Sequence, residues 1–342
     1  NWVSAVVTVL LAVLFAFLFV MDFDENPALV SINGKFLHIE NKKGRVLWTK
    51  KLGLDLERIE NKNIAKMIYR FENVNQDEFN ELILCNEFFD NTTDTINPGR
   101  IVCFDYKGKQ LWQYVFNDPI YAKGELQPLF YSTYLIDVKT QGNTKTLYAI
   151  AANSNFASAV FKLNASNGER IKNTLWNAGH FHDGIIGDFN KDGENEIVLT
   201  AINNGFERTM IVSIDLKNLT GQLPTTQNYL FHQVEEANYN KLVLLPVTDF
   251  AKFLGARFNI TLRGGLRYLN NEFSLTTAED ITSNSPANVN YRFNYDLKFL
   301  DVECSDVFQI IRDSLVAKGQ LEPPFTNTPE YELKLRNGII YR

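Results

Sequence analysis

The stretches IENKKGRVLW (residues 39–48) and CFDYKGKQLW (residues 103–112) share one pattern. In each, an apolar strand is followed by a short polar turn with one glycine and by a second strand that ends in Leu-Trp. Weaker copies of this Gly turn lie at 163–171 and 214–221. The turn glycines of the four copies are 64, 60 and 53 residues apart: Gly44, Gly108, Gly168 and Gly221. Because glycine tolerates the positive φ of a tight hairpin, each copy predicts two antiparallel strands.

A second pattern alternates with the Gly turn. It consists of an apolar strand, a loop rich in Asp and Asn, and another apolar strand, and its copies begin at Asn73, Asp137, Asp188 and, weakly, Asp249. For the first three copies, the next turn glycine follows after 35, 31 and 33 residues. Two independent patterns that stay in phase predict a repeat of two hairpins. Four strands in about 50–60 residues is the size of one propeller blade.

The predicted fold class is therefore all-β, a β-propeller of about five or six four-stranded blades. A β-sandwich would also contain short strands, but it would lack the four-strand period. Helical repeats are excluded because the apolar runs are short, β-branched and aromatic, and alternate with a period of two, as in residues 293–299. The propeller repeats are expected over residues 28–284, followed by a C-terminal segment of strands and a short helix over 285–342.

The two ends of the repeat are irregular. No Asx loop precedes the first Gly turn, so residues 28–52 supply only the outer half of a blade. An open ring would expose strand edges, and we therefore expect strands from residues 285–342 to complete this blade and close the propeller. Within that segment Ser305 is expected to cap a helix that stops at Gly319, and a last strand is expected over residues 332–341.

The N-terminal residues 2–21, WVSAVVTVLLAVLFAFLFVM, carry no charge. About 20 apolar residues at a rise of 1.5 Å span a hydrocarbon core of about 30 Å, and the run is longer than the apolar region of a secretory signal peptide. We expect an uncleaved transmembrane helix and a linker over residues 22–27. No Lys or Arg follows until Lys35, which favours an extracytoplasmic body. Because the chain begins with Asn1 rather than Met, we expect an upstream segment such as a cytoplasmic domain.

Composition narrows the function classes. Hydrophobic residues make up 45% and charged residues 22%, which are globular values. The chain has 34 basic and 40 acidic residues and a net charge of −6, without a basic stripe. Binding to nucleic acid needs clustered Lys and Arg, so no nucleic-acid partner is expected. Three cysteines are too few for a disulfide framework.

One Asx loop has the spacing of a cation site. Residues 188–196, DFNKDGENE, place oxygen side chains at positions 1, 3, 5 and 9, and glycine at position 6: Asp188, Asn190, Asp192 and Glu196, with Gly193. A hard cation such as Ca²⁺ requires alternating oxygen ligands and a sharp bend. The loop is not an EF-hand, because position 12 is Leu199 and apolar strands flank it. An Asx-rich turn that binds nothing is the alternative, since Asp, Asn and Gly populate turns in any case.

The loop D-x-N-x-D-G-x-x-E-[IL] at 188–197 resembles the FG-GAP/VCBS repeat of integrin-α-like β-propellers. The Gly turns that end in Leu-Trp resemble the blades of quinoprotein-like propellers, and together the resemblance covers about residues 28–280. The resemblance implies a structural Ca²⁺ bound by the side chains of Asp188, Asn190, Asp192 and Glu196 and by the backbone carbonyl of Glu194. It also implies a bacterial membrane-anchored protein, in which the propeller is often the periplasmic part of a signalling protein.

The other copies of the Asx loop depart from this pattern. At 73–81, Asn73 replaces the first Asp and Glu78 replaces the glycine of the bend, which weakens the expected affinity for a metal. The copies at Asp137 and Asp249 lack most ligands and are interpreted as structural.

Two further groups of residues have alternative interpretations. His180 and His182, with Asp183, could hold a transition metal, but without a further ligand cluster nearby we interpret the histidines as a polar pair at a blade entrance. Trp48, Trp112 and Trp176 stand at blade ends, and we expect packing between blades rather than a ligand platform.

The leading functional hypothesis is a non-enzymatic, membrane-anchored sensor module that binds an unknown small-molecule or protein ligand in the periplasm or at the cell surface. An envelope assembly or adhesion scaffold is an alternative on the integrin-like resemblance. A quinoprotein-type oxidoreductase is disfavoured, because the chain has no adjacent cysteines and too few blades for that family.

Overall fold

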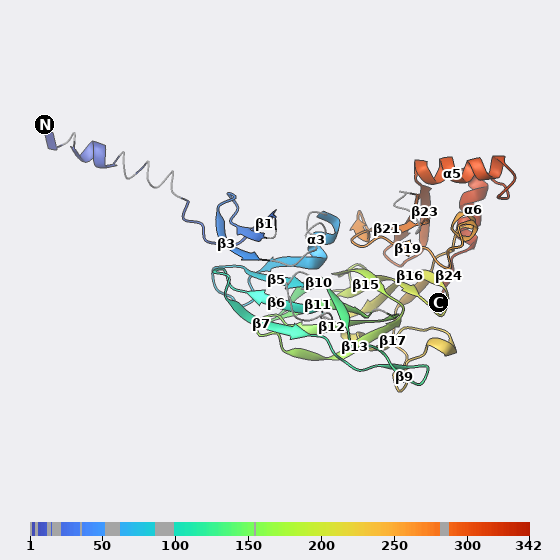
Figure 1. The fold of residues 1–342 in the computed structure, drawn as a ribbon, viewed down its shortest axis with the longest axis horizontal. Helices are drawn as coiled ribbons and strands as arrows, with labels where there is room; N and C mark the ends of the chain where they lie inside the picture. The colour runs from blue at the N-terminus through green and yellow to red at the C-terminus, as the bar shows by residue number, and fades with distance from the viewer. Residues whose placement is uncertain are drawn as a thin grey trace.

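The structure, a computed structural model, describes residues 2–3, 6–11, 15, 22–34, 36–51, 62–85, 99–153, 155–280 and 287–342 (Figure 1). Most of the described body is β-structure. In this part of the chain, five sheets of three or more strands follow one another in sequence, and in each the core is a run of neighbouring antiparallel strands. The arrangement is propeller-like, as the in-phase patterns predicted.

The first three sheets come from residues 29–178. The first contains β1 (Leu29–Asn33), β2 (Phe36–Glu40) and β3 (Val46–Lys51). The second contains β4 (Tyr69–Glu72), β5 (Glu81–Cys85), β6 (Arg100–Phe104) and β7 (Gln110–Val115). The third contains β10 (Tyr131–Gln141), β11 (Thr144–Asn153), β12 (Ala157–Asn164) and β13 (Arg170–Ala178), and the later strand β17 (Gly221–Gln222) joins it in parallel.

The last two sheets come mainly from residues 181–304. The fourth contains β14 (Phe181–Gly187), β15 (Glu196–Asn203), β16 (Arg208–Asp215), β18 (Lys241–Leu244) and β24 (Ile340–Tyr341). The fifth contains β19 (Ile260–Thr261), β21 (Glu272–Ala278), β22 (Asn288–Asn294) and β23 (Phe299–Cys304), with β20 (Arg267–Leu269) paired to β21. A two-stranded ribbon of β8 (Tyr121–Ala122) and β9 (Glu125–Leu126) lies apart from these sheets.

Short helices connect or cover the sheets. The first of them, α3 (Lys62–Ile68), lies between the first and fifth sheets in Figure 1. The others are η1 (Leu216–Asn218), η2 (Gln227–Tyr229), α4 (Asp249–Phe253), α5 (Asp306–Ala317) and α6 (Pro329–Asn337). Both α5 and α6 lie at the end of the molecule that is remote from β1–β3 (Figure 1).

Three of the four predicted Gly turns are hairpins. Gly44, Gly108 and Gly168 have φ values of 81°, 82° and 72°, and they connect β2 to β3, β6 to β7 and β12 to β13. The prediction was wrong for Gly221, which begins β17 and so leaves the fourth sheet for the third. The fifth sheet contains a copy that the sequence did not reveal, at Asn294–Lys298. Here Leu297 occupies the glycine position with φ 51°, and its N–H donates to Asn294 O at 3.0 Å.

Tryptophans at the ends of two sheets pack on the Gly turn of the next sheet, as expected. A Cβ on Gly108 would lie 2.8 Å from the ring of Trp48, and a Cβ on Gly168 would lie 2.6 Å from the ring of Trp112. The Trp112 indole N–H also donates to Ala165 O at 3.0 Å. These two glycines therefore serve the contact between sheets as well as the turn.

The described sheets do not close into a ring in the way we expected. Residues 285–342 contribute β22 and β23 to the fifth sheet, and β24 pairs with β18 of the fourth sheet. Within the described residues the first sheet keeps only β1, β2 and β3. The prediction that the C-terminal strands complete the first blade is thus wrong.

The C-terminal helices account for this difference. The predicted helix is confirmed as α5, where the Ser305 hydroxyl accepts from Phe308 N at 3.2 Å. The strand predicted over residues 332–341 is wrong, because most of it forms α6. Thr328 caps α6 with its side chain, Pro329 occupies its first turn, and acidic and basic residues stand at the appropriate ends of the helix dipole. Only Ile340–Tyr341 remain as a strand.

A charged cluster connects α4, α5 and α6. Arg312 on α5 is fully buried and donates from Nε and Nη2 to the two carboxylate oxygens of Asp249 at 3.0 and 2.9 Å. Tyr331 and Lys334 of α6 donate to the same carboxylate at 3.1 and 2.8 Å. Asp249, predicted to be structural, thus joins three helices.

Much of the predicted transmembrane helix, residues 2–21, lies outside the described residues, although 2–3, 6–11 and 15 are helical. In the described part of the chain, no helix is both long enough and apolar enough to cross a bilayer. The predicted linker follows and contacts the first sheet. Asn41 donates from Nδ2 to the Asp22 carboxylate and to Asp24 O.

Candidate metal-binding loop

The loop at residues 188–196 connects β14 to β15 and folds around its own side chains. Asp192 N donates to Asp188 Oδ1 at 3.0 Å and to Asn190 Oδ1 at 2.9 Å, and Gly193 N donates to Asp188 Oδ2 at 3.0 Å. Gly193 has φ 93°, so the bend requires glycine at this position. The backbone thus directs several side-chain oxygens toward the interior of one turn.

Three carboxylates meet in this loop. Asp188, Asp192 and Glu196 each offer one oxygen, and these oxygens lie within 4.8 Å of one another. Asp188 and Asp192 are exposed, whereas Glu196 at the start of β15 is 3% exposed. Its Oε2 accepts from Phe189 N at 2.9 Å, but its buried Oε1 has no hydrogen-bond partner in the described structure. Since buried polar atoms are normally paired, the Glu196 Oε1 atom is suited to act as a ligand of a cation.

The electrostatics of the loop agree with this description. Burial, together with the neighbouring Asp192 and Asp188 carboxylates, raises the pKa of Glu196. Hydrogen bonds from the Glu194 N–H and the Asn190 amide lower the pKa of Asp192. A divalent cation among the three oxygens would remove the repulsion that Glu196 experiences.

The structure brings together three of the five predicted ligands by their side chains. Asn190 also lies in the loop, where its Nδ2 donates to Asp192 Oδ2 at 2.9 Å and its Oδ1 accepts from Asp192 N. The Glu194 side chain is exposed, and its predicted role through the backbone carbonyl stays a prediction.

The related loop at 73–81 has the same framework but a different interior. Glu81 Oε2 accepts from Val74 N at 2.8 Å, as Glu196 does from Phe189. Asn75 Nδ2 donates to Asp77 Oδ2 at 2.9 Å, as Asn190 Nδ2 does to Asp192, but it also donates to Glu81 Oε1 at 3.0 Å. The Asn75 amide thus hydrogen-bonds the Glu81 oxygen that corresponds to the unpartnered Oε1 of Glu196. This difference makes the 73–81 loop a natural comparison for the 188–196 loop.

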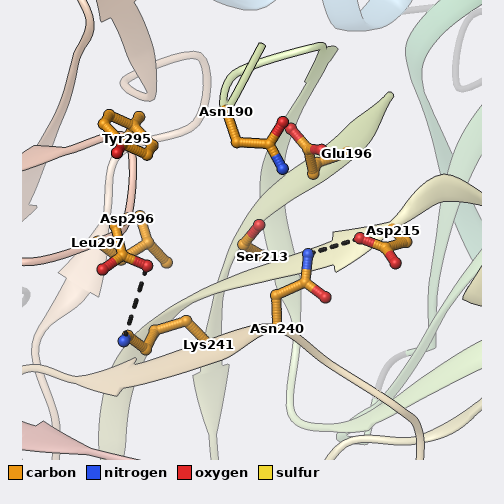
Figure 2. Close-up of a pocket in the computed structure, with 9 residues that line it drawn as sticks. All are labelled: Asn190, Glu196, Ser213, Asp215, Asn240, Lys241, Tyr295, Asp296 and Leu297. Atoms are coloured by element: carbon orange, nitrogen blue, oxygen red, sulfur yellow. Dashed lines mark hydrogen bonds and ion pairs between the residues drawn. The ribbon is translucent and has the colours of Figure 1, made fainter. Parts of the chain in front are cut away.

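A pocket of about 270 Å³ lies beside the acidic loop, between the fourth and fifth sheets. Figure 2 shows Asn190 and Glu196 on one side of it, an Asn240–Asp215 hydrogen bond of 2.7 Å, and a Lys241–Asp296 ion pair of 3.8 Å. The residues that line it are Asn190, Glu196, Ser213, Asp215, Asn240, Lys241, Tyr295, Asp296 and Leu297. Apart from the two loop residues, sequence analysis missed this set, because its members come from distant strands and turns.

The histidine pair lies elsewhere and is engaged in hydrogen bonds. His180 Nε2 is 2.9 Å from Asn153 O, and His182 Nδ1 is 2.9 Å from both Thr261 O and Thr261 Oγ1. Asp183 accepts from the N–H groups of Gly184 and Leu266. Burial, with a smaller effect of Arg263, lowers the pKa of His182 to about 3, so its ring is neutral at pH 7.

Comparisons with known proteins identify distant structural similarity only. No protein-family model and no curated protein matches the chain in sequence. Similar solved structures include the propeller of Dos1, with TM-score 0.35, 10% identity and 83% of this chain covered. The C-terminal domain of PilY1 from Pseudomonas aeruginosa gives TM-score 0.38, 11% identity and 78% coverage. A quinohemoprotein alcohol dehydrogenase from Pseudomonas putida HK5 gives 0.34, 12% and 76%. This chain spans 64%, 57% and 42% of those three chains, respectively.

Proposed function

We propose that this chain is a non-enzymatic, extracytoplasmic binding module in which a Ca²⁺ ion stabilises the hairpin β14–β15. The observation that carries the calcium assignment is the unpartnered, buried Glu196 Oε1 beside Asp188 and Asp192. Hard oxygen donors of this charge suit Ca²⁺. The proposed ion would be held by Asp188, Asn190, Asp192 and Glu196, with the Glu194 carbonyl as the remaining ligand.

The role of such an ion would be structural. The loop lies at one end of two largely buried strands, β14 and β15. Binding of the ion would fix the pocket wall that Asn190 and Glu196 form. A ligand or partner protein of a sensor would then meet a rigid rather than a fluctuating edge between the fourth and fifth sheets.

Calcium titration of the purified protein tests this proposal. At a calcium concentration of about 100 times Kd, the folded state should gain about 2.7 kcal/mol, visible as a higher Tm. Asp192→Asn and Glu196→Gln should abolish this rise. The matched control is Asp77→Asn in the comparison loop, which should leave the rise intact. A wild-type Tm that is equal with Ca²⁺ and with chelator would refute the site.

The pH dependence adds an independent readout. Because the pKa of Glu196 is raised in the folded state, its ionised form disfavours folding, and stability is lost as pH rises through that pKa. Without calcium, Glu196→Gln should therefore stabilise the protein at pH 7. With calcium, the wild type should instead have a higher Tm than Glu196→Gln.

We also propose that residues 2–21 anchor the chain in a membrane with its body outside the cytoplasm. The support is the uncharged apolar run and the absence of Lys and Arg between it and Lys35. The full-length protein should remain in the membrane pellet after carbonate extraction, and protease added outside the cytoplasm should digest residues 28–342. Release into the supernatant would contradict the anchor.

A further inference from the structure

A second hollow, of about 410 Å³, lies between α3 and the segment that precedes β20. Its walls come from parts of the chain that are about 200 residues apart in sequence. One wall is Ile64 of α3, and another is the segment Leu262–Gly265 with Arg267. The third wall consists of polar side chains from β21 and β22, namely Ser274, Thr276 and Asn290.

The hollow has two arginines without acidic partners. Neither Arg263 nor Arg267 forms an ion pair with a carboxylate of the described residues, whereas Arg292 of the same sheet pairs with both Glu272 and Asp301. The Cζ atom of Arg263 lies over the Tyr134 ring, 3.9 Å from its centre, and this cation–π contact restrains the guanidinium. A fixed guanidinium with free N–H groups matches a carboxylate bidentately.

The opposite wall presents hydroxyl and amide groups. Ser274 Oγ and Thr276 Oγ1 lie 3.1 and 3.3 Å from Asn290 Oδ1, to which both hydroxyls donate. The amide oxygen is therefore used, and the Asn290 Nδ2 and the lone pairs of the two hydroxyls remain for a ligand. This wall can both donate to and accept from the hydroxyl groups of a ligand.

Acidic groups limit the size of the positive region. An adjoining hollow shares Thr276 and Asn290 but is lined by Glu303 and Asp306. Asp183, which lies behind the segment, is buried, accepts from Leu266 N at 3.0 Å and is 3.9 Å from Lys66. A long polyanion would extend to the exposed carboxylates of Glu303 and Asp306 and be repelled, whereas a small monoanion would not reach them. Volumes of about 300–1,000 Å³ are typical of small-molecule sites.

We propose that this hollow binds a small polyhydroxylated carboxylate, a molecule of the sugar-acid class. The carboxylate would contact Arg263 and Arg267, and the hydroxyls of the ligand would contact Ser274, Thr276 and Asn290. The assignment rests on the proposed role of the chain as a binding module, and it is independent of the calcium loop.

Isothermal titration with D-gluconate tests the assignment. Sorbitol has the same carbon chain without the carboxylate, and inorganic phosphate is an anion without hydroxylated carbons. Gluconate should bind more tightly than either compound. Arg263→Gln and Arg267→Gln should weaken gluconate binding by roughly ten- to a hundredfold, the loss expected for charge-assisted hydrogen bonds. Arg267 is exposed, so its replacement tests the site even if the loss of Arg263 stacking disturbs folding.

Two controls separate this proposal from the calcium site. Arg292→Gln removes an equal charge from the same sheet outside the hollow, and it should leave the affinity for gluconate within twofold. Asp192→Asn should remove the calcium response and keep gluconate binding. Absence of gluconate binding, equal binding of sorbitol or phosphate, or an equal loss in Arg292→Gln would each overturn the assignment, with the calcium response measured separately.

Discussion

Substitution of Asp249 by Asn is expected to loosen the C-terminal helices from the fourth and fifth sheets. The change keeps the size of the side chain but removes the charge that faces the fully buried Arg312. Breaking a buried ion pair by removing one partner costs about 3–5 kcal/mol. Arg312 keeps Pro324 O at 2.8 Å and the Asp313 carboxylate at 3.6 Å, and Asp249 itself is 20% exposed. We therefore expect a smaller loss, about 2–4 kcal/mol.

For a chain of 342 residues, the expected loss corresponds to a decrease in Tm of about 3–6 °C by differential scanning calorimetry. Hydrogen exchange should locate the weakening in α5 and α6. The control is Asp301→Asn, which removes a carboxylate from an exposed pair with Arg292 and should cost at most about 1 kcal/mol. Equal Tm changes in the two variants would refute the view that Asp249 holds the helices together.

The pH dependence of this pair has a defined sign. Burial alone would raise the pKa of Asp249, but hydrogen bonds from Arg312 and Lys334 hold it well below its ordinary value. A depressed pKa contributes stability above the unfolded value of about 4, and this contribution is lost as pH falls toward the folded value. The Tm difference between the wild type and Asp249→Asn should be full at pH 7 and should narrow below about pH 4. A difference that widens in acid would contradict this reasoning.

Two further predictions concern the turns. Gly168→Ala should destabilise the protein by more than 2 kcal/mol, because the new Cβ would lie 2.6 Å from the Trp112 ring at a φ of 72°. The control Gly142→Ala, with open space around the Cβ at φ 58°, should cost only the backbone strain of about 1 kcal/mol. Equal urea midpoints for the two variants would contradict the contact between sheets. Leu297→Gly should relieve the backbone strain at φ 51° but also remove a fully buried side chain. The cost of the cavity should be the larger effect, so urea unfolding should show a net loss of about 2–3 kcal/mol. A net gain in stability would show that the leucine is not needed for packing.

The sequence predicted the hairpins correctly where the backbone conformation of the turn requires glycine. Gly44, Gly108 and Gly168 could be found because few residues other than glycine accept their φ values. Leu297 occupies the same turn position in the fifth sheet, but because it is not a glycine the sequence did not reveal this turn. Gly221 had the right residue and a different role, because tertiary pairing with β13 prevailed over the local turn pattern.

The candidate site could be predicted only in part for a related reason. The carboxylates of the 188–196 loop lie within nine residues, so spacing alone placed Asp188, Asp192 and Glu196 together. Spacing could not show that the Asn75 amide fills the corresponding position of the 73–81 loop, since that depends on side-chain orientation. The pocket beside the loop combines the fourth and fifth sheets, and the second hollow combines α3 with the fifth sheet, and no local sequence pattern links these residues.

The last strand predicted from sequence was wrong because helix-capping signals precede it. A strand is expected from sequence over residues 332–341, but Thr328, Pro329 and the charge order of α6 favour a helix. Helix capping and dipole terms of about 1 kcal/mol each decided the outcome in a segment with few buried side chains. The end of the chain consequently reached β18 rather than β1.

The path of β17 has a mechanical consequence. The chain leaves β16 of the fourth sheet, pairs in parallel with β13 of the third, and returns as β18 to the fourth. The connection from β16 to β18 thus joins the third and fourth sheets, and the hydrogen bonds between β13 and β17 must break before the two sheets can separate. A pulling force applied to the C-terminus would detach β24 from β18, but separation of the third and fourth sheets would still require the β13–β17 hydrogen bonds to break.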